Sequence, residues 1–87
     1  MAIVGRQIAA ARELLKITQA QLAEAAGVSE QTVKNFEVGR HYPRPSRLKA
    51  IVEEIERRGV VFTNGNEPGV KLRSSPPAHP EPPENVR

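Results

Sequence analysis

Cysteine is absent from the 87-residue sequence, so the chain has neither a disulfide framework nor a thiolate metal site. Histidine occurs only at His41 and His79, and neither has an acidic or hydroxyl partner at helical spacing. The sequence also offers no phosphate-binding loop and no nucleophile paired with a base. We therefore expect no enzymatic activity, no bound metal and no cofactor.

The N-terminal stretch MAIVGRQIAA contains no basic segment that leads into a long apolar run. We therefore expect a cytoplasmic protein that does not associate with membranes. Lys and Arg outnumber Asp and Glu by 13 to 10, which gives a net charge of +3. This charge is compatible with a polyanionic partner but does not by itself indicate one.

Three segments of different composition follow one another along the chain. Residues 1–58 carry apolar side chains at helical spacing, and a chain of this length has room for one modest core. Residues 59–73 form a candidate β-hairpin extension. Residues 74–87, SSPPAHPEPPENVR, are rich in proline and nearly free of aliphatic side chains, so we expect a disordered tail. A flexible linker or an extra partner-binding arm is the alternative for this tail.

Two short runs of β-forming residues, 60–63 and 70–72, flank the turn-rich segment 64–69. This pattern predicts a small β-hairpin. Two roles are open for it. An exposed edge of a two-stranded sheet could pair with a symmetric partner and so form a dimer. Alternatively, Val60 and Phe62 could simply cap the helical core.

The first two helices are predicted from apolar spacing and from local capping signals. A first helix runs from about Ile3 to Lys16, and its apolar face has helical spacing. The residues of this face are Ile8, Ala11 and Leu15, with Leu14 beside them. Thr18 and Gln21 have the spacing of a capping box, which begins a second helix. Gly27 can adopt a positive φ without penalty and ends it.

A third helix is predicted over residues 29–38. Ser29 is a good N-cap, because its hydroxyl can accept a hydrogen bond from a free backbone N–H of the first turn. Val33 and Phe36 then point to the same side of this helix. Gly39 ends it.

The fourth helix follows a segment with two prolines, Pro43 and Pro45, which remove backbone donors and restrict the residues before them. We therefore expect residues 41–45 to be non-helical and Ser46 to cap the helix. Its apolar residues repeat at helical spacing. They are Leu48, Ile51, Val52 and Ile55. Two arginines and Gly59 end the helix, so that four short helices share one core.

The stretch QLAEAAGVSEQTVKNF meets several requirements of a helix-turn-helix at once. Ala23 is small at the place where the two helices approach most closely, and Gly27 makes the turn between them. Apolar residues fill the angle between the helices. These are Leu22, Ala26, Val28, Val33 and Phe36.

The longer segment LLKITQAQLAEAAGVSEQTVKNFEVGRHYPRPSRLKAI resembles the phage-repressor and Cro-type helix-turn-helix domains, also called the XRE family. The resemblance covers roughly residues 6–58. It implies an all-α fold, a compact four-helix domain of the phage-repressor type followed here by the short C-terminal β-hairpin and the tail. It also implies binding to double-stranded DNA, usually as a homodimer.

Two further features fit this resemblance, and a third departs from it. Similar domains pair an arginine of the first helix with a glutamate after the recognition helix, and Arg12 and Glu37 occupy those places. The pair is expected to be partly buried and bidentate. Gly39 and Arg40 resemble the turn that leads back to the phosphate backbone. Many relatives continue with a fifth helix that forms the dimer, whereas β-type sequence follows Gly59 here.

If the third helix enters the major groove with its N-terminus first, the side chains of its first two turns face base edges. These side chains are Glu30, Gln31, Lys34 and Asn35. Glutamate can accept from cytosine, glutamine or asparagine can form two bonds to adenine, and lysine can donate to guanine. The alternative is that these residues form only the solvated face of an amphipathic helix, or that Lys34 contacts a phosphate.

Five residues are candidates for contacts to the DNA backbone. Gln19 and Ser29 lie at the starts of helices, where side chains and free backbone N–H groups can hold phosphate oxygens. Ordinary capping is the alternative for them. Arg40, Arg44 and Arg47 are long cations that flank the third helix. Unpaired surface cations without a function are the alternative there.

These features predict a sequence-specific transcriptional regulator that binds a partly palindromic operator as a dimer. An antitoxin-like adaptor is the alternative. Such a protein would bind a partner protein through its tail or hairpin while its helical domain represses its own operon.

Overall fold

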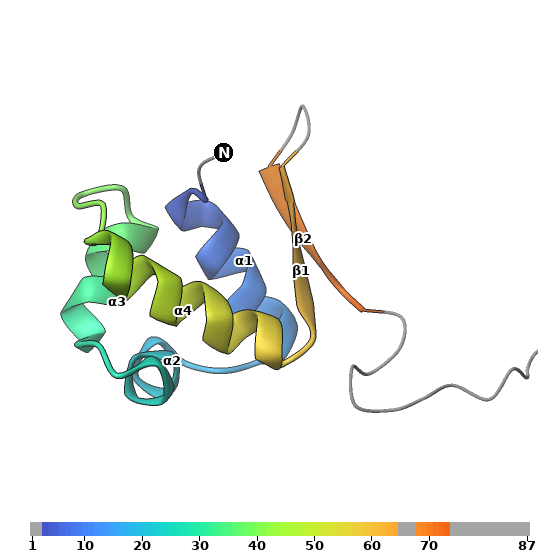
Figure 1. The fold of residues 1–87 in the computed structure, drawn as a ribbon, viewed down its shortest axis with the longest axis horizontal. Helices are drawn as coiled ribbons and strands as arrows, with labels where there is room; N and C mark the ends of the chain where they lie inside the picture. The colour runs from blue at the N-terminus through green and yellow to red at the C-terminus, as the bar shows by residue number, and fades with distance from the viewer. Residues whose placement is uncertain (1–2, 65–67, 74–87) are drawn as a thin grey trace, which may run out of the picture.

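The computed structural model of the chain describes residues 3–64 and 68–73. Four helices are followed by a two-stranded antiparallel sheet (Figure 1). They are α1 (Gly5–Leu15), α2 (Gln19–Ala26), α3 (Glu30–Glu37), α4 (Pro45–Arg57), β1 (Val60–Asn64) and β2 (Pro68–Leu72). The predicted four-helix domain with a C-terminal hairpin is therefore confirmed. The tail that was expected to be disordered, residues 74–87, lies outside the described residues.

The start and end of α2 follow from its own sequence. Thr18 Oγ1 accepts from the backbone N–H of Gln21 at 3.0 Å, and Gln21 Oε1 accepts from the backbone N–H of Thr18 at 2.8 Å. This is the predicted capping box. Gly27 ends the helix with φ of +75°, in the left-handed region that favours glycine. Its N–H and that of Val28 then bond to carbonyl groups of the last turn.

Ser29 caps α3 as predicted, because its hydroxyl accepts from the backbone N–H of Thr32 at 3.0 Å. The prediction that Ser46 caps α4 is wrong. The helix begins one residue earlier, at Pro45, after Arg44 as the N-cap residue and without a side-chain cap. Proline suits this first position because its fixed φ is helical and its missing N–H would have no partner there.

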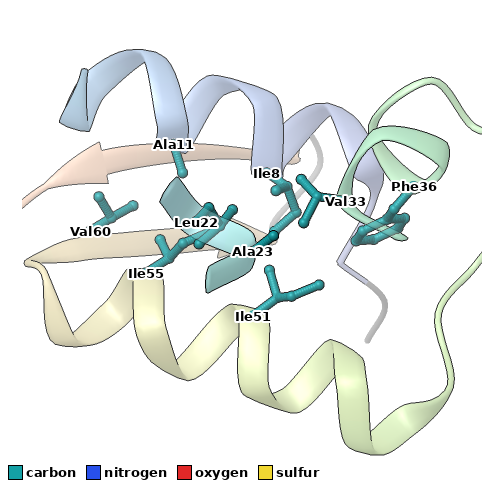
Figure 2. Packing of buried hydrophobic residues seen from close by; sticks show 9 residues of the cluster. All are labelled: Ile8, Ala11, Leu22, Ala23, Val33, Phe36, Ile51, Ile55 and Val60. Carbon is teal, nitrogen blue, oxygen red and sulfur yellow. The ribbon is translucent and has the colours of Figure 1, made fainter. Parts of the chain in front are cut away.

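The core lies between the four helices and is closed by the hairpin (Figure 2). Its buried hydrophobic residues come from all four helices and from β1. They are Ile8, Ala11, Leu22, Ala23, Val33, Phe36, Ile51, Ile55 and Val60. The predicted apolar faces of the helices are thus largely confirmed. Leu15 is only partly buried, and Leu14 is 40% exposed.

The hairpin packs against the first and last helices, β2 on α1 and β1 on α4. Val60 is fully buried, and Phe62 and Val70 pack against the core as partly buried side chains. The hairpin therefore does cap the helical core, which is one of the two roles that its sequence left open.

A buried glutamine, Gln7, fastens the hairpin to α1. Only 2% of Gln7 is exposed. Its Nε2 donates to the backbone oxygens of Thr63 at 3.2 Å and Gly69 at 3.0 Å, one on each strand. Its Oε1 accepts from the backbone N–H of Val4 at 2.9 Å. The side-chain amide of Gln7 therefore provides hydrogen-bond partners for backbone groups at the start of α1 and on both strands of the hairpin.

Candidate nucleic-acid interface

An ion pair between α1 and the end of α3 fixes the position of α3. Arg12 Nε donates to Glu37 Oε2 at 2.7 Å, and an Arg12 Nη donates to Glu37 Oε1 at 2.9 Å. The side chains are 19% and 5% exposed. The hydrogen bond to Glu37 raises the pKa of Arg12 despite the opposing effect of burial. The bidentate, partly buried pair implied by the resemblance is therefore present.

Gln19, the first residue of α2, joins the same cluster. Its Nε2 donates to Glu37 Oε1 at 2.9 Å, so the amide group of its side chain faces the ion pair. Within residues 3–64 and 68–73, its backbone N–H donates no hydrogen bond. The backbone N–H of Gln19 is therefore available to a phosphate, whereas its side-chain amide already donates one hydrogen bond to Glu37.

The candidate base-reading residues share the outer face of α3. Glu30, Gln31 and Lys34 are exposed, and Asn35 is partly buried. Gln31 Nε2 donates to Asn35 Oδ1 at 3.0 Å, so these two amide groups form a single hydrogen-bonded pair. The opposite face of α3 supplies Val33 and Phe36 to the core, as Figure 2 shows. The helix therefore presents a polar face to solvent, while its opposite face packs in the core.

Asn35, Arg44 and Arg47 are brought together beside α3, around a polar pocket of about 250 Å³. The pocket is lined by residues of α3, of the α3–α4 connection and of α4. They are Thr32, Asn35, His41, Tyr42, Pro43, Arg44 and Arg47. One candidate base-reading residue thus adjoins two of the candidate phosphate-binding arginines.

Ser29 and Arg40 flank α3, Ser29 directly before its first residue and Arg40 shortly after its last. Arg40 is exposed just after α3, and its backbone N–H donates to the Asn35 oxygen at 2.8 Å. The Ser29 hydroxyl lies 2.9 Å from Thr32 Oγ1 and also accepts from the Thr32 N–H, so it is occupied in capping. Neither residue lines the pocket.

Tyr42 has a structural role that sequence reasoning missed. Its hydroxyl donates to the Ile3 oxygen at 3.0 Å, and its ring meets that of Phe36 edge to face with centroids 5.2 Å apart. The α3–α4 connection is thereby held against the start of α1. The sequence does show that Tyr42 lies between Gly39 and the two prolines, but its hydrogen-bond partner, Ile3, is 39 residues away in the sequence.

Among residues 3–64 and 68–73, no group of three His, Cys, Asp or Glu side chains could hold a metal ion. In the same part of the chain, no helix is both long and apolar enough to cross a membrane. The polar side chains that line the pocket beside α3 are one amide, two hydroxyls, one imidazole and two guanidinium groups, and groups of these kinds bind bases and phosphates.

A comparison with models of protein families decides the identity of this domain. The model described as helix-turn-helix matches residues 8–58. The chain belongs to this helix-turn-helix family. The match confirms the resemblance to phage-repressor and Cro-type domains, and the protein is accordingly a DNA-binding transcription regulator whose partner is double-stranded DNA. The matched stretch ends before β1, so the hairpin lies outside the matched residues. No curated protein matches the chain.

Proposed function

We propose that this helix-turn-helix protein is a sequence-specific regulator that reads the major groove with α3 and binds a partly palindromic operator as a homodimer. One observation carries the proposal. The outer face of α3 presents four polar side chains, while the Arg12–Glu37 pair and the core hold the other side of the helix. A recognition helix needs this combination of a free polar face and a fixed orientation.

The chemistry of the outer face supports base reading. Gln31 and Asn35 carry amide groups that can donate and accept at the same base pair, which suits adenine. Lys34 can donate to guanine, and Glu30 at the start of the helix can accept from cytosine. Each good bidentate contact contributes about 1–3 kcal/mol of discrimination between bases.

The backbone contacts are assigned to residues around α3. The free N–H of Gln19 and the N-terminal turn after Ser29 offer backbone donors to phosphate oxygens. Arg40, Arg44 and Arg47 add long cations on the flank of α3. Phosphate contacts of this kind supply affinity and orientation, whereas the side chains of α3 supply the choice of sequence.

A selection from random DNA duplexes tests this proposal. We expect an enriched site with two inverted half-sites about one helical turn apart, roughly 34 Å. Gln31→Ala and Asn35→Ala should each change or relax the enriched sequence at one or two positions. Lys71→Ala, on an exposed residue of the hairpin, is the matched control and should select the same site.

The outcomes distinguish a sequence-specific regulator from an antitoxin-like adaptor. Failure to enrich any sequence, or an unchanged site for both α3 variants, would contradict sequence reading by α3. Purification of the full chain with a stoichiometric partner protein, together with an absence of enrichment, would favour the adaptor function instead.

A further inference from the structure

His41 lies in the connection between α3 and α4 and lines the polar pocket beside α3. Its backbone N–H donates to the oxygen of Asn35 at 3.3 Å, and the N–H of Arg40 donates to the same oxygen at 2.8 Å. The side chain of His41 is exposed, and within residues 3–64 and 68–73 no hydrogen bond or ion pair involves its imidazole ring. His41 is therefore attached to α3 through its backbone, while its ring lies exposed at the pocket.

Two cavities adjoin His41, and no carboxylate of the described residues lines either of them. The charged or titratable side chains that face His41 are those of Tyr42, Arg44 and Arg47. The other lining residues are neutral. They are Thr32, Asn35 and Phe36 from α3, Val4 and Gly5 from the start of α1, and Gly39 and Pro43 from the connection. With two guanidinium groups and no negative charge, this surface attracts an anion.

The pocket adjoins the face of α3 that carries the candidate base-reading side chains. Asn35, one of the four polar side chains of that face, lines the pocket together with Arg44 and Arg47. When a helix lies in the major groove, the residues that flank it meet the phosphate backbone at the edge of the groove. In Figure 1 the α3–α4 connection lies at the end of the domain away from the hairpin. The phosphate groups of a duplex bound to α3 are therefore the anions that suit this pocket.

An imidazole ring suits a phosphate better in one of its two charge states. The protonated ring has two N–H donors and a positive charge, whereas the neutral ring has one donor and one acceptor. Phosphate oxygens accept hydrogen bonds, and a nearby negative charge favours the protonated ring. Histidine is also the side chain that ordinarily changes its charge between about pH 5 and about pH 8.

We propose that protonated His41 binds a phosphate group of the DNA backbone together with Arg44 and Arg47, so that DNA binding takes up a proton and strengthens as the pH falls. This inference rests on the proposed insertion of α3 into the major groove and adds a pH-dependent contact to it. Both arginines stay charged at every accessible pH. Because the DNA-bound state holds the additional proton, the gain in affinity is complete at low pH and is lost as the pH rises through the range in which the bound ring loses that proton.

The affinity of the full chain for a DNA duplex, measured by fluorescence anisotropy at about pH 6 and about pH 8.5, tests the proposal. We expect the wild type to bind about fivefold more tightly at the lower pH, which is the upper end of the effect of one exposed ion pair. His41→Gln should remove this difference, because glutamine stays neutral. His41→Arg should bind tightly at both pH values. His79→Gln, at the other histidine of the chain, is the matched control and should behave like the wild type.

Two further measurements separate a phosphate contact from a general effect of pH on the protein. In the wild type, the slope of log affinity against log salt should be larger in magnitude at the lower pH by about 0.9 per bound chain, whereas in His41→Gln it should not change with pH. Calorimetry in two buffers of different ionisation enthalpy should show that the wild type takes up more protons on binding than His41→Gln does. Circular dichroism at both pH values checks that each variant is folded.

An affinity of the wild type that does not depend on pH, or an equal pH dependence in His41→Gln, would overturn the proposal. The measurements use both the enriched operator and an unrelated duplex of equal length, because a phosphate contact does not require base reading. An effect of His41 on the unrelated duplex, without any enriched operator, contradicts only sequence reading by α3. An enriched operator that is bound equally at both pH values contradicts only the role of His41.

Discussion

Gly5 and Phe36 are in direct backbone contact, since a Cβ atom added to Gly5 would overlap the carbonyl group of Phe36. The first turn of α1 therefore rests on the last turn of α3. A few residues further along α1, Arg12 forms the ion pair with Glu37. α1 thus contacts the end of α3 at two places, and the orientation of α3 depends on both.

Gly5→Ala should destabilise the domain by about 1–3 kcal/mol, the usual cost of inserting an atom into a filled contact. A loss of stability would be informative, because alanine normally makes a helix more stable than glycine does. Urea denaturation measures the effect. Arg6→Ala, on the adjacent exposed residue, is the control and should change stability by less than about 0.5 kcal/mol. Equal stability of Gly5→Ala and wild type would show that α1 and α3 are not in backbone contact.

Glu37→Ala should cost about 3 kcal/mol of stability, because it leaves the partly buried Arg12 cation without its carboxylate. The raised pKa of Arg12 keeps this cation charged across the accessible pH range. The double variant with Arg12→Ala should lose clearly less than the sum of the single losses, as a double-mutant cycle would measure. The exposed Lys49–Glu53 pair is the control, where Glu53→Ala should cost under about 1 kcal/mol. Additive losses at Arg12 and Glu37 would contradict their coupling.

The helix-turn-helix could be predicted from the sequence because its signals are local. Thr18 and Gln21, or Ser29 and the first turn of α3, are three residues apart, so capping depends only on nearby backbone. The one capping error, at Ser46, arose from treating Pro45 as a helix breaker. Proline excludes a helix interior but not the first turn, and the local sequence offered both starting points.

The contacts that were missed join residues far apart in the chain. Gln7 reaches carbonyl groups 56 and 62 residues away, and nothing in its own neighbourhood distinguishes it from an exposed helical glutamine. Gly5 likewise gives no local sign that α3 will lie against it. Arg12 and Glu37 are 25 residues apart and were anticipated only through the family resemblance. The candidate DNA contacts remain predictions, since they require the ligand itself.

Gln7→Glu should weaken the attachment of the hairpin to α1, while the hydrogen bond at the start of α1 is retained. The carboxylate can still accept from Val4, but it loses the Nε2 group that donates to Thr63 and Gly69 and places negative charge beside their oxygens. We expect a loss of about 1–3 kcal/mol, the cost of leaving buried polar groups unsatisfied. Hydrogen exchange should show faster exchange in β1 and β2 than in α2 and α3. Uniform acceleration throughout the domain would contradict a local role.

Arg44→Ala and Arg47→Ala should weaken DNA binding nearly uniformly across sequences and make it less dependent on salt. If each guanidinium group neutralises one phosphate, the slope of log affinity against log salt should fall in magnitude by about 0.9 per variant. Asn35→Ala, at the same pocket, should instead lower discrimination between operators and leave the slope unchanged. Lys71→Ala, on β2 rather than beside α3, is the charge-matched control and should alter neither quantity. A slope that is unchanged by both arginine variants would remove them from the phosphate contacts. If Lys71→Ala lowered the slope equally, the salt effect would reflect only the net charge of the protein. It would then give no evidence that Arg44 and Arg47 contact the DNA backbone.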